Sequence, residues 1–298
     1  MMVKNLSLIM LIVFLSACSP PKTAQGTNFP HADPKIQALI ERTLSDMIFV
    51  EGGSFMMGDK KSTFINVFGD EVYGYFHPMY ADSRPAHKVT LDGYYMSRYE
   101  ITFGEHDLFS EAAGRIPTMA DDIGELWRGG PNHPAGVNWQ GAHDYCDWLG
   151  ERTGLPFALP TEAQWEYAAR SRGKVVPFAT DTGLIEPGVN YPEPLDWPLP
   201  VGQFPPNPLG FHDMSGNAYE WVADWYDPEY YGKSPEHNPQ GPATGTKKVY
   251  RGGGVGSSPG ASSTVIRGVG TFEREATASW GFRCVINTDQ PLSVSAGR

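Results

Sequence analysis

Oxygen-bearing side chains that could hold a cation are concentrated in one aromatic stretch, residues 213–226, with the sequence DMSGNAYEWVADWY. Its potential oxygen ligands are Asp213, Asn217, Glu220 and Asp224. Gly216 lies where a tight backbone turn forms easily. The stretch is too polar for an ordinary core segment and too aromatic for an ordinary loop. Because buried polar groups need partners, we expect a buried turn that holds a cation or a hydrogen-bond network.

The N-terminus has the features of a lipoprotein signal. In residues 1–17, Lys4 supplies a positive charge, and the apolar segment Leu6–Leu15 is too short to span a bilayer stably. Small residues precede Cys18, as a lipoprotein signal peptidase requires. We therefore expect cleavage before Cys18 and a lipid on that residue. An ordinary secretory signal with a chance cysteine is the alternative.

The residues after Cys18 indicate where the chain is attached. Residues 18–32 are a polar tether that contains Pro and Gly. Ser19 follows the cysteine, which in a Gram-negative cell resembles the signal for outer-membrane sorting. Since two or more acyl chains on one cysteine give stable attachment, we expect a protein anchored by lipid to the periplasmic face of the outer membrane.

The composition limits the fold class and the partners. The chain has 298 residues with 34 Gly, 26 Pro and only 19% charged residues, which favours short elements joined by many loops. The net charge of −11 makes nucleic acid a poor candidate partner. The acidic groups could serve cations, although solubility alone is a sufficient reason for them.

Helix starts are recognisable from their capping residues. The predicted N-caps are, in chain order, Asp33, Thr102, Asn138 and Thr161. Glu105 and Gln164 follow two of these by three residues, which is the spacing of a capping box. The first helix is expected over residues 33–46, and Gly154 ends the clearest one.

Alternating apolar residues and glycine turns predict the strands. The expected segments are 47–58 with an internal Gly-Gly turn, 87–96, 248–254 and 279–286. Within the second segment, Val89 and Leu91 are expected to point inward.

Two cysteines remain once Cys18 is assigned to lipid. In an exported chain, the pair Cys146 and Cys284 suggests one disulfide, and two buried free thiols are the alternative. Neither makes a recognisable catalytic pair with a base, so we do not expect a cysteine nucleophile.

Seven segments in order resemble the formylglycine-generating enzyme (sulfatase-modifying factor) family. They read FVEGGSFMMG, HKVTLDGYYMSRYEIT, PAGVNWQGAHDYCDWLGERTG, LPTEAQWEYAARSRG, DMSGNAYEWVADWY, VYRGGG and SWGFRC. The resemblance implies one α+β domain of C-type lectin-like fold, rich in irregular loops, over residues 47–288. A polar tail, residues 289–298, follows it.

The resemblance also implies cation ligands and a disulfide. The positions that hold a structural Ca²⁺ in the family are Asp213, the carbonyls of Gly216 and Ala218, and Glu220. For a second Ca²⁺, the matching positions are Asn190, Tyr191 and Asp196. Cys146 and Cys284 match a family disulfide that joins the same helix and strand.

The family's copper site is altered in this chain. The two copper-binding cysteines of the family correspond to Ser257 and Ser262, its active-site Ser to Gly254 and its cleft Trp to Tyr219. Hydroxyl oxygens are poor Cu(I) ligands compared with thiolates, so no copper is expected.

Two functions are compatible with this pattern. The first is a binding or accessory module of the cell envelope that recognises a protein or peptide ligand on the face near 257–274. The second is a PvdO-like periplasmic oxidoreductase that acts on a small peptide or siderophore precursor without active-site cysteines. Its candidate catalytic or positioning residues would be Glu273, Glu275, Arg274, Arg267 and Tyr219, although a surface charge cluster is the alternative at 273–275.

Overall fold

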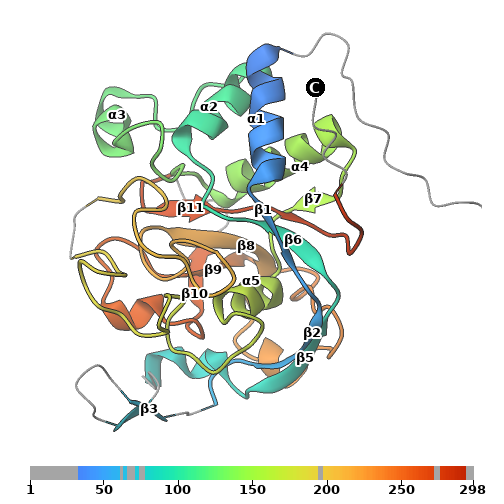
Figure 1. Ribbon diagram of the computed structural model, residues 1–298, viewed down its shortest axis with the longest axis vertical. Helices are drawn as coiled ribbons and strands as arrows, with labels where there is room; N and C mark the ends of the chain where they lie inside the picture. Colours follow the sequence, from blue (N-terminus) through green and yellow to red (C-terminus); the bar gives the residue numbers. More distant parts are fainter. Residues whose placement is uncertain are drawn as a thin grey trace, which may run out of the picture.

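Short strands and helices separated by long irregular segments make up an α+β fold (Figure 1). The computed structural model describes residues 33–60, 63–65, 71–73, 78–193, 197–271 and 276–292. The predictions for the signal peptide, the tether and the lipidation of Cys18 lie outside these residues. So do the predicted roles of Asp196, Glu273, Arg274 and Glu275.

Two four-stranded sheets form the frame. The first has the order β1-β6-β12-β7 and is antiparallel throughout, and the second has the order β10-β9-β8-β11, with β8 and β11 parallel. The strands of the first are β1 (Met47–Val50), β6 (Tyr94–Ser97), β12 (Val285–Ile286) and β7 (Phe157–Ala158). Those of the second are β10 (Gly268–Thr271), β9 (Lys247–Arg251), β8 (Tyr219–Trp225) and β11 (Trp280–Phe282).

Two further strand pairs lie outside these sheets. They are β2 (Gly53–Met57) with β5 (His87–Leu91), and β3 (Thr63–Ile65) with β4 (Glu71–Tyr73).

The helices divide into two groups and one outlier. In Figure 1, α1 (Pro34–Ser45), α2 (Phe103–Ala112) and α4 (Trp139–Thr153) gather at one end, while α5 (Glu162–Ala169) contacts β2, β8 and β9. The outlier, α3 (Asp122–Arg128), stands at the periphery. Three 3₁₀ turns complete the described elements: η1 (Pro78–Ser83), η2 (Tyr230–Gly232) and η3 (Pro259–Ser262).

The predicted helix caps are confirmed. Asp33, Thr102, Asn138 and Thr161 each accept a backbone N–H in the first turn of their helix. Both capping boxes are complete, because the side chains of Glu105 and Gln164 accept hydrogen bonds from the backbone N–H groups of Thr102 and Thr161. No helix in the described part of the chain is long and apolar enough to cross a membrane.

The prediction of a strand, a turn and a second strand over 47–58 is confirmed as β1 and β2, and three other points need correction. β1 and β2 pair with different strands, β6 and β5, and a Cβ at Gly52 in the turn between them would lie 2.5 Å from the carbonyl oxygen of Leu91. Segment 87–96 is interrupted at 92–93, and segment 279–286 is interrupted at 283–284. Helix α3 was not predicted, although its N-cap, Asp121, is a residue type that favours that position.

The disulfide between Cys146 and Cys284 is present and fully buried. It joins α4 to the segment between β11 and β12, which fits the pairing that the resemblance implied. Around it, the aromatic side chains of Tyr145, Trp148 and Phe282 form a continuous core cluster. The cross-link therefore fixes the helical end of the domain against the C-terminal strands.

Candidate functional site

The stretch 213–226 begins as a tight turn and continues as strand β8. Asp213, Gly216 and Asn217 all have positive φ angles, of 60°, 99° and 62°. The Gly216 N–H donates to the carbonyl oxygen of Gly252 at 2.8 Å, which ties the turn to the end of β9. The expected buried polar turn is therefore confirmed, and its side chains are carried into the core at the start of β8.

Glu220 is completely buried and fully hydrogen-bonded. The Arg283 guanidinium donates to both of its oxygens, at 2.7 Å from Nε and 2.6 Å from the terminal nitrogen. The indole N–H of Trp165 donates to the same carboxylate at 2.7 Å. These bonds explain how a carboxylate with no exposed surface remains in the core.

Glu100, which the sequence interpretation missed, is brought to the same turn. It is 1% exposed, and it accepts from the Asn217 amide at 3.2 Å and from the Ala218 N–H at 3.3 Å. Burial raises its pKa well above the usual range, and the neighbouring carboxylates of Asp213 and Glu220 raise it further. The available signal was a glutamate between aromatic and apolar neighbours in YEIT.

Asp213, Glu100 and Glu220 are three carboxyl groups near a single arginine, Arg283. One oxygen of Asp213 accepts from the Gly202 N–H at 2.6 Å. Burial raises the pKa of Asp213 to about 6, and the nearby Glu220 adds to the effect, while the Gly202 N–H and Arg283 oppose it. With all three carboxyls ionised, Arg283 leaves an excess of two negative charges.

The sequence resemblance assigns a Ca²⁺ to this turn, and that assignment remains a prediction. The residues that would hold it are Asp213 and Glu220 through carboxylates, and Gly216 and Ala218 through backbone carbonyls. No group of three or more His, Cys, Asp and Glu side chains in the described ranges is arranged to hold a metal ion. The expected calcium ligands include only two such side chains, Asp213 and Glu220, together with two backbone carbonyls.

Asp224 does not join this group, although it is only four residues from Glu220. It is 3% exposed and accepts from the backbone N–H of Glu162 at 2.7 Å. Burial, with the charge of Glu162 nearby, raises the pKa of Asp224 to about 7. The initial grouping of Asp224 with the other oxygen ligands is therefore wrong, because the strand carries it to the far end of the sheet.

Asn190 and Tyr191, two of the residues expected to bind a second Ca²⁺, accept local hydrogen bonds within the loop 186–191. The Asn190 side-chain oxygen accepts from the Glu186 N–H at 2.8 Å, and the Tyr191 carbonyl accepts from the Gly188 N–H at 2.8 Å. The Asn190 amide donates to Asp181 at 2.9 Å. The assignment of this calcium site remains a prediction.

Ser257 and Ser262 both have engaged hydroxyl groups. The Ser257 Oγ donates to the carbonyl oxygen of Gly254 at 2.6 Å. Ser262 has no exposed surface, and its Oγ lies 2.9 Å from the hydroxyl of Tyr191. A Cβ at Gly253 would lie 2.2 Å from that Oγ, so Ser262 is packed tightly under the glycine turn.

Tyr219 and Arg267 have structural contacts. The ring of Tyr219 packs against Tyr250 and Trp280, with ring centroids 4.9 and 5.2 Å away, and covers Gly254 closely. Arg267 is 3% exposed and donates twice to the Glu162 carboxylate, at 2.8 and 3.0 Å. Its proposed role in positioning a substrate is therefore wrong.

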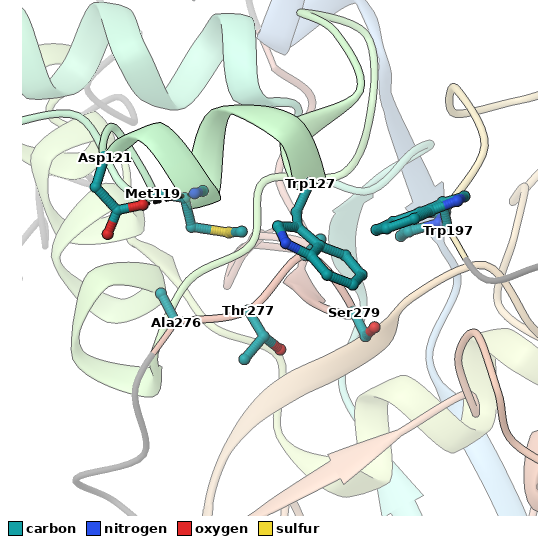
Figure 2. A pocket seen from close by; sticks show the side chains of 10 residues that line it. Met119, Asp121, Trp127, Trp197, Ala276, Thr277 and Ser279 are labelled. Atoms are coloured by element: carbon teal, nitrogen blue, oxygen red, sulfur yellow. Dashed lines mark hydrogen bonds between the residues drawn. The ribbon is translucent and has the colours of Figure 1, made fainter.

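An open cleft lies beside these positions. A narrow cavity of about 90 Å³ is lined by Ser257, Gly254, Glu193 and neighbouring residues, and it shares Trp197 with a larger cavity of about 570 Å³. Figure 2 shows the larger cavity between Trp127, Trp197 and the segment 276–279. The two cavities are neighbours that share Trp197 as a lining residue, and Ser257 lines the smaller one.

Comparison with known proteins identifies the family. Residues 33–288 match the sulfatase-modifying factor enzyme 1-like domain. The chain belongs to this family. Its α+β architecture is a C-type lectin-like fold, as the sequence resemblance implied.

Individual members of the family differ in their overall length. The chain is 28% identical to the formylglycine-generating enzyme of Streptomyces coelicolor, over 80% of this chain and 85% of that enzyme. It is 29% identical to the serine/threonine-protein kinase pkn1 of Chlamydia caviae over 70% of this chain. It spans about a third of the kinase's length, since the match covers 33% of that protein.

A solved relative shares the fold over nearly its whole length. The structure of PvdO from Pseudomonas aeruginosa is 27% identical, with a TM-score of 0.64 over 80% of this chain and 93% of PvdO.

Proposed function

We propose that this chain is a membrane-tethered binding module of the cell envelope, built on the family's domain without its copper and cysteine chemistry. The observation that carries the proposal is the pair of engaged hydroxyls. Ser257 bonds to Gly254, and Ser262 is buried beneath the glycine turn. Thiolates bind Cu(I) far better than hydroxyl groups do, so this pair is poorly suited to copper.

The cleft beside the altered site supports ligand binding. Two neighbouring cavities share Trp197 as a lining residue there. The domain around it is cross-linked by Cys146–Cys284 and therefore presents the cleft on a rigid frame. A protein or peptide of the envelope is the proposed ligand.

Membrane attachment is proposed to occur through lipid on Cys18, at the periplasmic face of the outer membrane. The support is the signal-like segment 1–17 and the small residues before the cysteine. Labelled palmitate should be incorporated into the wild-type chain and lost in Cys18→Ser. Equal labelling of the two chains would contradict the proposal.

Calcium is proposed as a structural ion at Asp213, Gly216, Ala218 and Glu220. When bound, it would supply charge neutralisation at the turn. The surplus of acidic groups over arginines supports it, because Asp213 and Glu100 accompany Glu220 beside Arg283.

The test of the binding-module proposal is a copper and oxidation assay on the purified mature chain. Cu(I) titration followed by incubation with a cysteine-containing peptide should give neither stoichiometric copper binding nor aldehyde in the peptide. The Ser257→Cys/Ser262→Cys double variant is the matched control, because it restores both thiol positions and should gain copper affinity. Tight copper binding or aldehyde formation by the wild-type chain would overturn the proposal.

A second candidate is a PvdO-like oxidoreductase that acts without these cysteines, and the likeness to PvdO over most of both chains favours it. Oxygen uptake in the presence of a siderophore-precursor peptide would reveal it. Turnover that disappears in Glu273→Gln or Glu275→Gln would support this candidate and remove the pure binding function.

A further inference from the structure

Two partly exposed tryptophans form a wall of the larger cavity. Trp127 on α3 is 43% exposed and Trp197 is 44% exposed. Their ring centroids are 3.9 Å apart with an angle of 54° between the planes. Figure 2 shows Trp127 between Met119 and Trp197, with Thr277 and Ser279 on the opposite side of the cavity.

The size of the cavity suits a small ligand or a single side chain. Its volume is about 570 Å³, within the usual range for small-molecule sites. Two indoles and the thioether of Met119 give it polarizable, electron-rich walls. The Thr277 and Ser279 side chains add hydroxyl groups.

The described residues that line the cavity carry a negative charge. Among the described residues that line it, Asp121 is the only charged one, and its side chain is exposed. Arg128, on the same helix α3, makes its contacts away from the cavity lining. It donates to Asp107 and to the Thr118 carbonyl oxygen and lies over the ring of Phe103 at 4.4 Å. The net charge of −11 for the whole chain also favours a cationic ligand.

We propose that the Trp127–Trp197 pocket binds a weakly hydrated organic cation, such as an alkylated ammonium or a guanidinium group. The faces of indole rings attract cations through their quadrupole, and Asp121 supplies the opposite charge. Methylated ammonium and guanidinium groups lose less hydration than a primary ammonium group when they enter such a pocket. The inference rests on the proposed binding function, because it names the chemistry of the ligand for that cleft.

The same chemistry already occurs in the interior of this protein. The Lys248 ammonium lies 3.8 Å from the ring centroids of both Trp139 and Trp225. There the chain supplies its own cation to a tryptophan pair. In the described part of the chain, no Lys or Arg lies over Trp127 or Trp197.

The test compares two ligands of the same shape and different charge. Choline and its neutral isostere 3,3-dimethylbutan-1-ol are titrated into the mature protein while the indole N–H signals are followed by NMR. Choline should shift the signals of Trp127 and Trp197 in a saturable way and bind at least tenfold more tightly than the alcohol. Equal binding of the two, or no binding of choline, would overturn the inference.

Variants locate the effect. Trp197→Leu should weaken choline binding by about tenfold or more, and Asp121→Asn by a smaller factor with a reduced dependence on salt. Asparagine can still cap α3 through its side-chain oxygen, so the second variant keeps the fold. Phe49→Leu is the matched control, because Phe49 is another aromatic residue that is 43% exposed but lies outside the cavity. An equal loss in Phe49→Leu would overturn the inference.

Two further probes distinguish the source of the cation. Stronger binding of tetramethylammonium identifies an alkylated ammonium, whereas stronger binding of N-methylguanidinium identifies an arginine-like group. Either result supports the pocket. If the protein chemically converts a bound cation, the proposal of a binding module without catalysis is wrong, while the cation site at Trp127 and Trp197 is supported. If no cation binds and no oxidation occurs, the cation site is wrong, while the binding-module proposal is not contradicted.

Discussion

Two groups of carboxylates both contact Trp165 and differ in how their charge is balanced. The indole N–H of Trp165 donates to Glu220 of the first group, and the Arg251 guanidinium of the second group lies 5.1 Å from the centroid of the ring. Glu162, Glu166 and Glu220 are all at most 1% exposed. Glu100 of the first group is equally buried, so these glutamates lie at the same depth, whereas Asp213 is half-buried.

In the second group, which we call the matched group, three arginines serve two glutamates, and each glutamate has two arginine partners. Arg251 donates to Glu162 and Glu166 at 2.8 Å each, Arg267 donates to Glu162, and Arg170 donates to Glu166 at 2.7 Å. Burial alone would raise the pKa of Glu162, but Arg267 and Arg251 hold it below the usual value.

In the first group, one arginine serves three acids. Arg283 pairs with Glu220, while burial raises the pKa of Glu100 well above normal and that of Asp213 to about 6. The comparison shows that the number of cationic partners, and not depth, decides the direction of the shift. The group with matched charges supports the fold by itself, and the other group is the place where a cation would be stabilising.

The largest expected effect comes from breaking the matched group. Arg251→Met removes one arginine partner from each of the buried carboxylates Glu162 and Glu166. The free energy of unfolding should therefore fall by about 3–5 kcal/mol. Urea denaturation of both proteins measures it. Lys88→Met is the control, since Lys88 pairs with Glu236 at the surface and should cost about 1 kcal/mol or less. Similar losses for the two variants would contradict the difference between buried and exposed pairs.

Asp224 provides the next test, because it adds a further acid at the edge of the matched group. Its pKa is about 7 in the folded protein and near 3.8 when unfolded, so folding favours the protonated form. This contribution to stability is complete below about pH 4 and is lost as the pH rises toward 7. It amounts to at most about 4 kcal/mol.

Asp224→Asn should therefore flatten the pH dependence of stability between pH 4 and 8, measured by urea denaturation at several pH values. The asparagine oxygen can still accept the Glu162 N–H. Glu151→Gln, a change at an exposed carboxylate on α4, should leave the profile of the wild-type protein unchanged. A profile for Asp224→Asn that matches the wild type would contradict the assigned titration.

Calcium should act only on the group with excess charge. At a hundredfold excess over its dissociation constant, a bound ion adds about 2.7 kcal/mol, so a chelator should lower the Tm of the wild-type protein. In Glu220→Gln the difference between calcium and chelator should disappear, although its basal Tm also falls because Arg283 loses a partner. Metal analysis of the wild-type chain gives a check that does not depend on the variant. No bound calcium, together with a Tm unaffected by chelator, would refute the site.

Asp213→Asn should give the smallest effect. The amide oxygen can still bind a cation and accept the Gly202 N–H, but one negative charge is removed. Calcium affinity should fall by about tenfold, or about 1.4 kcal/mol, as measured by competition with a chelator. Complete loss of calcium dependence would show that the charge of Asp213, and not its oxygen, is what the site needs.

Features that depend on neighbours in sequence could be predicted. The caps Thr102 and Thr161 act on backbone groups three residues away, so their local spacing was sufficient. The inward-pointing Val89 and Leu91 follow from strand alternation, and both are buried. Helix α3 was missed because it is short and, in a weakly periodic segment, its cap is the only clear signal.

Features that depend on distant contacts could not be predicted in this way. Glu100 meets Asn217 across 117 positions of sequence, and Arg267 meets Glu162 across 105. Nothing in the local pattern around Glu100 indicates that it joins the turn. The spacing of Glu220 and Asp224 suggested one site, but the strand places them in two different charged groups.

The sequence by itself therefore determined the family, the helix starts and the oxygen-rich turn at 213–220, since these rest on residue types and short spacings. Only the tertiary structure decided which charges are matched and which are in excess. It also decided that Trp127 and Trp197, 70 residues apart in the chain, line one pocket. The physical reason is that burial and charge balance belong to groups of residues that meet only when the chain is folded.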